Sequence, residues 1–284
     1  MTSLPLKISK MSGAGNTFAV LDARSGSAWS QVEKDLSMSR ADFAKMICDP
    51  VQGICADGFL LIEEGSQDID YKWDFYNSDG STAEMCGNAA RCAARYCHEV
   101  LKPATNSQIR FLTGAGLVDA QIVKDHQVCV LMPEARFLQR EIALKTRWGS
   151  FEKFALVNTG VPHLVQKVQD ISTVQGMKEM AREVRSHHDL KPAGANVTFY
   201  AEEFKGQIKA VTYERGVENY TLACGTGAVA AALVYTDESK SQQVNVEMPG
   251  GSLRVTFPEG EVRPLMLGEA IFIGEFQYNL EVMK

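Results

Sequence analysis

The sequence predicts an α+β protein built mainly from antiparallel sheets, each closing around a helix. Short segments with alternating, β-branched or aromatic residues recur along the 284 residues, whereas only four stretches have helical spacing. A nine-residue motif also occurs twice, about half a chain apart. Because repeats of this kind usually mark duplicated structural units, the chain is expected to form two pseudo-symmetric domains.

Thirteen segments have the composition and alternation of short strands. These strands are predicted at residues 6–11, 18–22, 59–63, 71–77, 108–112, 117–123, 128–132, 151–157, 196–200, 208–214, 243–248, 252–257 and 270–276.

Four segments are predicted to be helices, at residues 40–48, 86–100, 174–188 and 224–235. The first ends before Asp49-Pro50 and the second before Pro103, where proline stops a helix. A strand ends at Met132-Pro133, so the boundary between domains is expected there. We therefore expect one domain at 1–132 plus 271–284 and the other at 133–270.

Composition and charge exclude several classes of protein. Lys plus Arg number 29 and Asp plus Glu 35, and a net charge of −6 argues against a nucleic-acid partner. The chain shows no signal peptide and no apolar run long enough for a membrane helix. Seven cysteines form an odd set without an export signal, which favours reduced thiols in a cytoplasmic protein.

The repeated motif consists of CGNAARCAA at 86–94 and CGTGAVAAA at 224–232. Its two first residues, Cys86 and Cys224, lie 138 residues apart, and each is expected to open a helix of small residues. The first-turn N–H groups of a helix have no intrahelical acceptor and lie at its positive end. Such a position favours a thiolate and can bind a carboxylate.

Two thiols on opposite sides of one carbon could invert its configuration, since one thiolate removes a proton while the opposing thiol donates one. The helix N–H groups would stabilise the charge that develops on a neighbouring carboxylate. This chemistry requires neither a metal nor a pyridoxal cofactor. Taken singly, each cysteine could equally be a small buried core residue, and only their pairing favours catalysis.

The chain resembles the diaminopimelate epimerase family. The resemblance covers nearly the whole chain, and its motifs occur in the family's order. These motifs are KMSGAGN at 10–16, FYNSDG at 75–80, EMCGN at 84–88, ARC at 90–92, Pro162-His163, Asn196, YERG at 213–216, LACGTG at 222–227 and MPGGSL at 248–253.

The resemblance implies two domains, each a barrel-like sheet around a central helix, with the active site in the cleft. It also implies the interconversion of LL- and meso-diaminopimelate, an amino-acid substrate of lysine and peptidoglycan precursor biosynthesis. The family uses no cofactor, and the resemblance allows a homodimer.

By motif position, the resemblance assigns a role to each of twelve residues. Cys86 and Cys224 would be the two acid/base groups, with His163 and Glu214 orienting and tuning them and the reacting amino group. The reacting carboxylate would be held by Gly87, Asn88, Gly225 and Thr226. Other amino-acid groups of the substrate, chiefly at its distal end, would be bound by Asn16, Asn77, Asn196 and Arg215, since arginine can hold a carboxylate through two hydrogen bonds.

The sequence departs from the family's usual pattern at four places. These are Thr17 in place of aspartate, Ala89 in place of glycine, Val161 in place of asparagine, and one extra residue within 217–221. None alters the two cysteines, so the departures bear on substrate preference and not on the type of reaction.

Three alternatives stand beside this interpretation, namely a dinucleotide-binding module, a related racemase and a catalytically inactive binding protein, and the presence of both cysteines disfavours the last of these. A G-x-G-x-x-A pattern at 225–230 could bind a dinucleotide, but it needs a buried strand running into Gly225, and residues 216–223 are polar. A related cofactor-independent racemase of the same fold could act on another amino acid, and Arg215 would discriminate it. The helical offsets of Cys86, Cys92, Cys97 and His98 do not gather a tetrahedral metal site.

Overall fold

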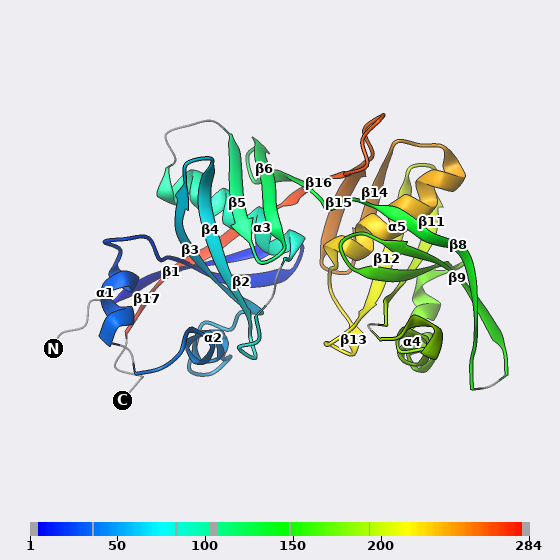
Figure 1. Ribbon diagram of the computed structural model, residues 1–284, viewed down its shortest axis with the longest axis horizontal. Coiled ribbons are helices and arrows are strands. Elements are labelled where there is room, and N and C mark those ends of the chain that lie inside the picture. The colour runs from blue at the N-terminus through cyan, green and yellow to red at the C-terminus, as the bar shows by residue number, and fades with distance from the viewer. Residues whose placement is uncertain are drawn as a thin grey trace. The chain divides into compact units, whose positions relative to one another are not determined.

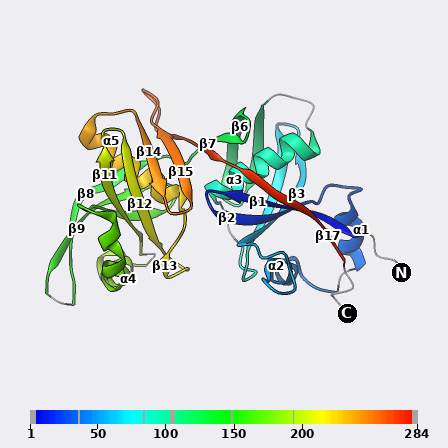
Figure 2. The same cartoon turned by 180° about the vertical axis from the view of Figure 1, so that it is seen from behind.

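The computed structural model describes residues 5–35, 37–82, 85–102, 107–147, 149–192 and 194–279. The chain divides into two compact units, unit 1 (Met1–Val130 with Glu269–Lys284) and unit 2 (Leu131–Gly268). Each unit consists mostly of strands with a few helices (Figures 1 and 2), which confirms the predicted α+β class. Within the described part of the chain, no helix is both long and apolar enough to cross a membrane.

Unit 1 contains eight strands that pair in a single series. Of the seven neighbouring pairs in this series, the third and the fifth are parallel and the other five are antiparallel. In spatial order the strands are β17 (Ile271–Tyr278), β1 (Leu6–Gly13), β2 (Asn16–Asp22), β3 (Gly58–Ser66), β4 (Ile69–Asn77), β5 (Gln108–Thr113), β6 (Gly116–Lys124) and β7 (Gln127–Leu131).

Unit 2 repeats this topology. Its eight main strands follow the same series of antiparallel and parallel pairings, and a two-residue strand, β13 (Asn219–Tyr220), adds to the end of β12. In spatial order the main strands are β8 (Arg136–Lys145), β9 (Phe151–Asn158), β10 (Pro162–Lys167), β11 (Asn196–Phe204), β12 (Gln207–Glu214), β14 (Gln243–Met248), β15 (Gly251–Thr256) and β16 (Leu265–Glu269).

One buried helix occupies the same place in each topology. Helix α3 (Gly87–Tyr96) joins β4 to β5 and continues into a short π-helix, η1 (Cys97–Leu101), while α5 (Gly225–Ser239) joins β13 to β14. Strands from both halves of each series contact the helix, so each sheet curls around it. Alanines make this close approach feasible, since Ala89, Ala90, Ala93 and Ala94 of α3 are all fully buried, as are four alanines of α5.

A second core lies on the outer side of each sheet. In unit 1, α1 (Ala28–Asp35) and α2 (Arg40–Cys48) pack there, with the Trp29 ring 4.7 Å from that of Phe43. Ser39 caps α2 by accepting a hydrogen bond from the Asp42 N–H. In unit 2, the corresponding layer contains the 3₁₀-helix η2 (Ile171–Met177) and α4 (Lys178–Arg185).

The structure corrects the sequence prediction at several elements. The predicted helix at 174–188 is instead η2 followed by α4, and the short 3₁₀-helix η3 (His188–Leu190) comes after it. Helix α1 and the strands β8, β10, β13 and β16 were not predicted. Strand β8 is largely exposed and so lacks an alternating pattern, β10 begins with a proline, and β16 contains a glycine.

Gly13, at the end of β1, lies against the start of α3. A Cβ atom on Gly13 would lie 2.8 Å from the carbonyl oxygen of Asn88, which is backbone and cannot rotate away. Gly274 in β17 offers a matched control, because a Cβ there would meet nothing closer than 3.7 Å. We expect Gly13→Ala to lower the free energy of unfolding by about 1–3 kcal/mol and Gly274→Ala to change it far less. Urea denaturation of both variants measures this, and equal effects would contradict the close packing of β1 on α3.

Candidate active site

Each cysteine of the repeated motif is the N-cap residue of its central helix. Cys86 precedes α3 with φ −143° and ψ 123°, and Cys224 precedes α5 with φ −124° and ψ 109°. In unit 2, the Cys224 Sγ accepts a hydrogen bond from the Gly227 N–H at 3.4 Å. Both thiols therefore lie where the unsatisfied N–H groups of a helix start favour negative charge.

The other predicted site residues lie at strand ends near these helix starts. In unit 1, Asn16 begins β2 and Asn77 ends β4. In unit 2, His163 is the second residue of β10, while Asn196 begins β11 and Glu214 ends β12. Each unit thus brings its own predicted residues to one end of its sheet. Glu84 of the family motif lies outside the described residues.

Asn16 is oriented toward Cys86 by a carboxylate that the sequence did not reveal. Asp57 accepts hydrogen bonds from the Asn16 Nδ2 at 3.1 Å and from the Thr17 N–H and hydroxyl at 2.7 and 2.8 Å. The remaining amide oxygen of Asn16 accepts from the Cys86 Sγ at 4.0 Å. Thr17, the residue that follows Asn16, therefore also contacts Asp57. Asp57 is 40 residues from Thr17 in sequence, and no motif pointed to it.

Arg91 is a second residue whose role the motif did not reveal. Its side chain is fully buried in unit 1, one turn into α3. Its guanidinium donates to the Asn88 Oδ1 at 2.7 Å, the Gly87 carbonyl at 3.3 Å and the Glu269 carbonyl at 3.2 Å. All three acceptors are neutral. Burial lowers the pKa of Arg91, and the nearby Cys92 and Cys86 thiols act in the opposite direction when ionised.

In unit 2, Glu214 is a carboxylate next to Cys224. Burial raises the pKa of Glu214, and hydrogen bonds from the Thr221 hydroxyl and the Cys224 thiol partly offset this rise. Because two groups donate hydrogen bonds to the Glu214 carboxyl group, this group acts as a hydrogen-bond acceptor. Glu214 can therefore take a proton from Cys224 or bind an ammonium group.

His163 is fully buried, and its hydrogen bonds determine which ring nitrogen carries the proton. The backbone N–H of Arg215 donates to the Asn196 Oδ1 at 2.8 Å, so the other end of that amide, Nδ2, donates to the His163 Nε2 at 3.3 Å. Nε2 is thus an acceptor, and the proton resides on Nδ1, 2.9 Å from the Thr198 hydroxyl. Burial also lowers the pKa of His163 to about 3, so the ring is neutral.

The neutral ring supports the start of α5 through Thr226. The Thr226 hydroxyl lies 3.0 Å from the His163 Nε2 and 3.4 Å from the Cys224 Sγ. Behind the ring, the Thr198 hydroxyl lies 3.0 Å from that of Thr212. A Cβ at Gly227 would fall 2.2 Å from the Thr212 hydroxyl, which explains why α5 has glycine there. A hydrogen-bonded series therefore runs from two buried threonines through His163 to Cys224.

The strand registers of the two units correspond, but equivalent positions carry different side chains. In the parallel pairs, Phe18 lies opposite Gly58 in unit 1, and His163 lies opposite Asn196 in unit 2. The next strand carries Asn77 in unit 1 and Glu214 in unit 2 at the same level. The two units therefore share the same backbone arrangement at these positions, and unit 2 carries the ionisable groups there.

The remaining predicted residues take simpler positions. Asn77 is exposed, and its Nδ2 donates to the Ser81 hydroxyl at 2.9 Å. The Arg215 side chain is also exposed at the end of β12. Residues 221–224, immediately before Gly225, form no strand, which contradicts the dinucleotide-binding alternative.

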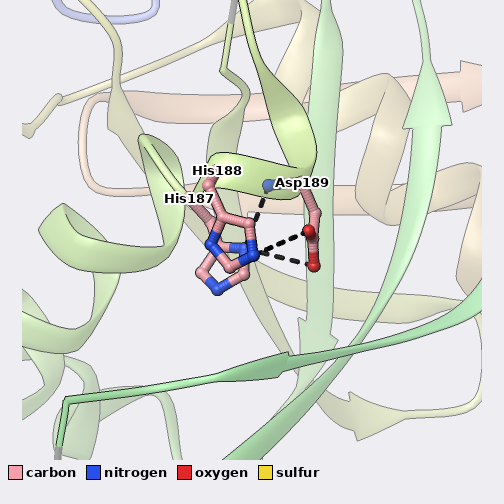
Figure 3. Close-up of side chains that lie close together, drawn as sticks. All are labelled: His187, His188 and Asp189. Atoms are coloured by element: carbon pink, nitrogen blue, oxygen red, sulfur yellow. Dashed lines mark hydrogen bonds and ion pairs between the residues drawn. The ribbon is translucent and has the colours of Figure 1, made fainter.

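A histidine-rich cluster occurs elsewhere in unit 2 (Figure 3). His187, His188 and Asp189 are consecutive, and the Asp189 carboxylate lies 3.5 Å from the His187 Nδ1 and 3.0 Å from the His188 Nε2. The His187 Nδ1 also accepts from the Asp189 N–H at 3.3 Å and so caps η3. The hydrogen bonds of this turn account for the cluster.

The burial of His163 predicts a specific loss of stability in acid. Its pKa is about 3 in the folded chain and about 6.5 when unfolded, so the stabilisation is complete above about pH 6.5 and declines as the pH falls toward 3. We expect wild type to lose up to about 1.4 kcal/mol per pH unit more than His163→Gln in this range. Urea denaturation at several pH values tests this, with exposed His126→Gln as a control. Equal slopes for wild type and His163→Gln would contradict the neutral buried ring.

The family model for diaminopimelate epimerase matches residues 8–138 and 155–273 of the chain. A diaminopimelate epimerase from Aquifex aeolicus is 36% identical over 281 residues, covering 97% of this chain and 98% of its own length. Another from Hydrogenobaculum sp. is 40% identical over 228 residues, covering 80% and 81% of the two chains.

A solved structure resembles the whole chain at lower identity. The probable proline racemase from Agrobacterium radiobacter K84 superposes with a TM-score of 0.70 at 17% identity, covering 97% of this chain and 93% of its own. This likeness confirms the predicted fold. Taken with the sequence matches, it shows that the chain belongs to the diaminopimelate epimerase family.

Proposed function

We propose that this protein is an isomerase that converts LL-diaminopimelate to meso-diaminopimelate by proton transfer at Cys86 and Cys224. The observation that carries the proposal is the duplication of one arrangement, a cysteine at the N-cap of a buried helix, in two units of the same topology. We take the two catalytic domains to be residues 1–132 with 271–284, and 133–270. The product is a precursor of lysine and peptidoglycan.

The proposed reaction consists of two proton transfers at one α-carbon. A thiolate takes the α-hydrogen as a proton, which leaves the bonding electron pair on the substrate, and the other thiol donates its proton to the opposite face. The electron pair is shared with the α-carboxylate. The helix-start groups of Gly87, Asn88, Gly225 and Thr226 hold this carboxylate and stabilise the added charge. The two cysteines exchange roles in the reverse direction, and the thiols themselves are the acid and the base.

Glu214 and His163 support the Cys224 side of the reaction. The Glu214 carboxylate, which accepts from the Cys224 thiol, also suits the ammonium group next to the reacting carbon. His163 keeps its Nε2 lone pair directed at Thr226 and so holds that residue beside Cys224. Both residues therefore orient reacting groups.

The distal end of diaminopimelate carries a second ammonium and a second carboxylate. The exposed Arg215 guanidinium suits that carboxylate, and the side-chain amides of Asn16, Asn77 and Asn196 offer further donors and acceptors. Asn196 already donates to His163 and accepts from the Arg215 backbone, which leaves one amide hydrogen for the substrate. Asn196 is buried, and a buried amide left without its partner would disfavour amino acids that lack a second head group.

Replacing either cysteine tests the proposal. We expect Cys86→Ser and Cys224→Ser each to lower kcat for LL-to-meso conversion at least about 100-fold, because a hydroxyl is a far weaker acid and base at neutral pH. Chiral separation of the product measures the rate, and Cys55→Ser, which changes an exposed cysteine, provides the control.

Near-wild-type conversion by either variant would refute the two-thiol mechanism. The wild-type protein should be offered proline as well. Conversion of proline and not of diaminopimelate would favour the related racemase activity instead.

A further inference from the structure

The turn between β12 and β13 is attached to the outer layer of unit 2. Residues 215–218 form this turn, and its first residue is the exposed Arg215. Helix α4 lies next to the turn (Figure 1), and the last residue of the helix, Arg185, faces Glu218. The Arg185 Nε lies 3.0 Å from the Glu218 Oε2, and only 18% of the Arg185 side chain is exposed. An ion pair therefore joins α4, which has no part in the proposed reaction, to a turn that carries a proposed substrate-binding residue.

Glu218 is held in the turn by its backbone as well as by Arg185. Its φ of 57° is a left-handed conformation that few residues other than glycine adopt. The Glu218 N–H donates to the Glu214 carbonyl at 2.8 Å, and the Glu218 Oε1 accepts from the Gly216 N–H at 3.1 Å. The two carboxylate oxygens therefore have separate partners, Oε1 within the turn and Oε2 on α4.

Arg185 also fixes the strand on the other side of Arg215. Its carbonyl accepts a hydrogen bond from the N–H of Ala195, the residue before Asn196, at 2.9 Å. The Asn196 Oδ1 in turn accepts from the Arg215 N–H at 2.8 Å. A closed series of contacts therefore runs from Arg185 through Asn196 and the turn to Glu218 and back to Arg185.

The contact between Arg185 and Glu218 is electrostatic. Within the described part of the chain, the Arg185 Nε makes no well-aligned hydrogen bond. Because the Arg185 side chain is largely buried, water and salt screen its attraction to the carboxylate less than they would at an exposed pair. Glu179 and Glu183 lie on the same helix but pair with Arg147. Loss of the charge on either Arg185 or Glu218 would therefore remove the ionic attachment of the turn to α4.

We propose that the Arg185–Glu218 ion pair holds the β12–β13 turn in the position in which Arg215 binds the distal carboxylate of the substrate. The inference rests on the proposed function, which assigns that carboxylate to Arg215. Arg185 and Glu218 are then positioning residues, because they act through Arg215 and contact no reacting atom. An arginine on an unattached turn would lose more conformational freedom when it binds, and this loss would weaken substrate binding.

Steady-state kinetics with LL-diaminopimelate test the proposal. Glu218→Gln removes the negative charge but keeps a side-chain oxygen for the Gly216 N–H, and Arg185→Met removes the guanidinium but keeps an apolar side chain. We expect each variant to raise KM about 3- to 10-fold and to leave kcat within about 2-fold of wild type, because the distal carboxylate binds away from the reacting carbon. Glu179→Gln is the matched control, since it breaks another ion pair of α4 and should change neither constant.

Further variants show whether the pair acts as a unit and through Arg215. Arg185→Lys keeps the positive charge and should raise KM less than Arg185→Met does. Combining Arg185→Met with Glu218→Gln should raise KM no more than the larger single change, because each variant already breaks the same contact. In an Arg215→Met background, Glu218→Gln should raise KM by less than about 2-fold, since the group that the turn positions is absent.

An unchanged KM in Glu218→Gln would overturn the proposal, as would a lower kcat with KM unchanged. The same rise in KM with and without Arg215 would also overturn it, because the turn would then act on binding by another route. If Arg185→Met does not fold, Glu218→Gln decides the matter, since the Glu218 side chain is 41% exposed. A wild-type protein that does not convert LL-diaminopimelate would refute the proposed function and this inference together, whereas normal wild-type conversion with unaltered variants would refute the inference alone.

Discussion

The burial of a helix of small side chains inside its own sheet is the constraint on which each half of this protein depends. A sheet can curl around a helix only if the helix is thin, and the alanines of α3 and α5 meet this requirement. The helix can enter the sheet only at the end where the preceding strand stops. The N-cap cysteine is therefore held by backbone geometry, beside the strand ends that carry the polar side chains.

Local contacts across this arrangement show how little space is left. A Cβ on Gly13 would collide with the Asn88 carbonyl in unit 1, and one on Gly227 would collide with the Thr212 hydroxyl in unit 2. The start of α3 is thus packed against the end of β1, three residues before Asn16, and the start of α5 against β12, which carries Glu214. This packing allows hydrogen bonds as specific as the one from Asn196 to His163 to persist.

Much of this organisation can be predicted from the sequence, because it depends on local patterns. The alternating segments mark most strands, and the repeated Cys-Gly motif marks both helix starts. The roles of Asp57 and Arg91 could not be predicted from local sequence. Asp57 contacts Asn16, which lies 41 residues away in the sequence, and Arg91 contacts Glu269, which lies 178 residues away. Helix α1 was missed because its eight residues are stabilised by Trp29 packing on Phe43 and Phe59 more than by any local pattern. The sequence repeat also concealed that corresponding strand ends carry Asn77 in unit 1 and Glu214 in unit 2, which only the strand order and register show.

The most direct test of the central claim, that two thiols each serve one face of the α-carbon, follows hydrogen isotopes. The protein is incubated with LL-diaminopimelate in deuterated water, and α-deuterium is measured at low conversion in both the meso product and the recovered LL substrate. Two thiols predict deuterium in nearly every product molecule and almost none in the recovered substrate, because the donating thiol has already exchanged with solvent. Product that retains the original α-hydrogen, or equal labelling of product and recovered substrate, would contradict the account.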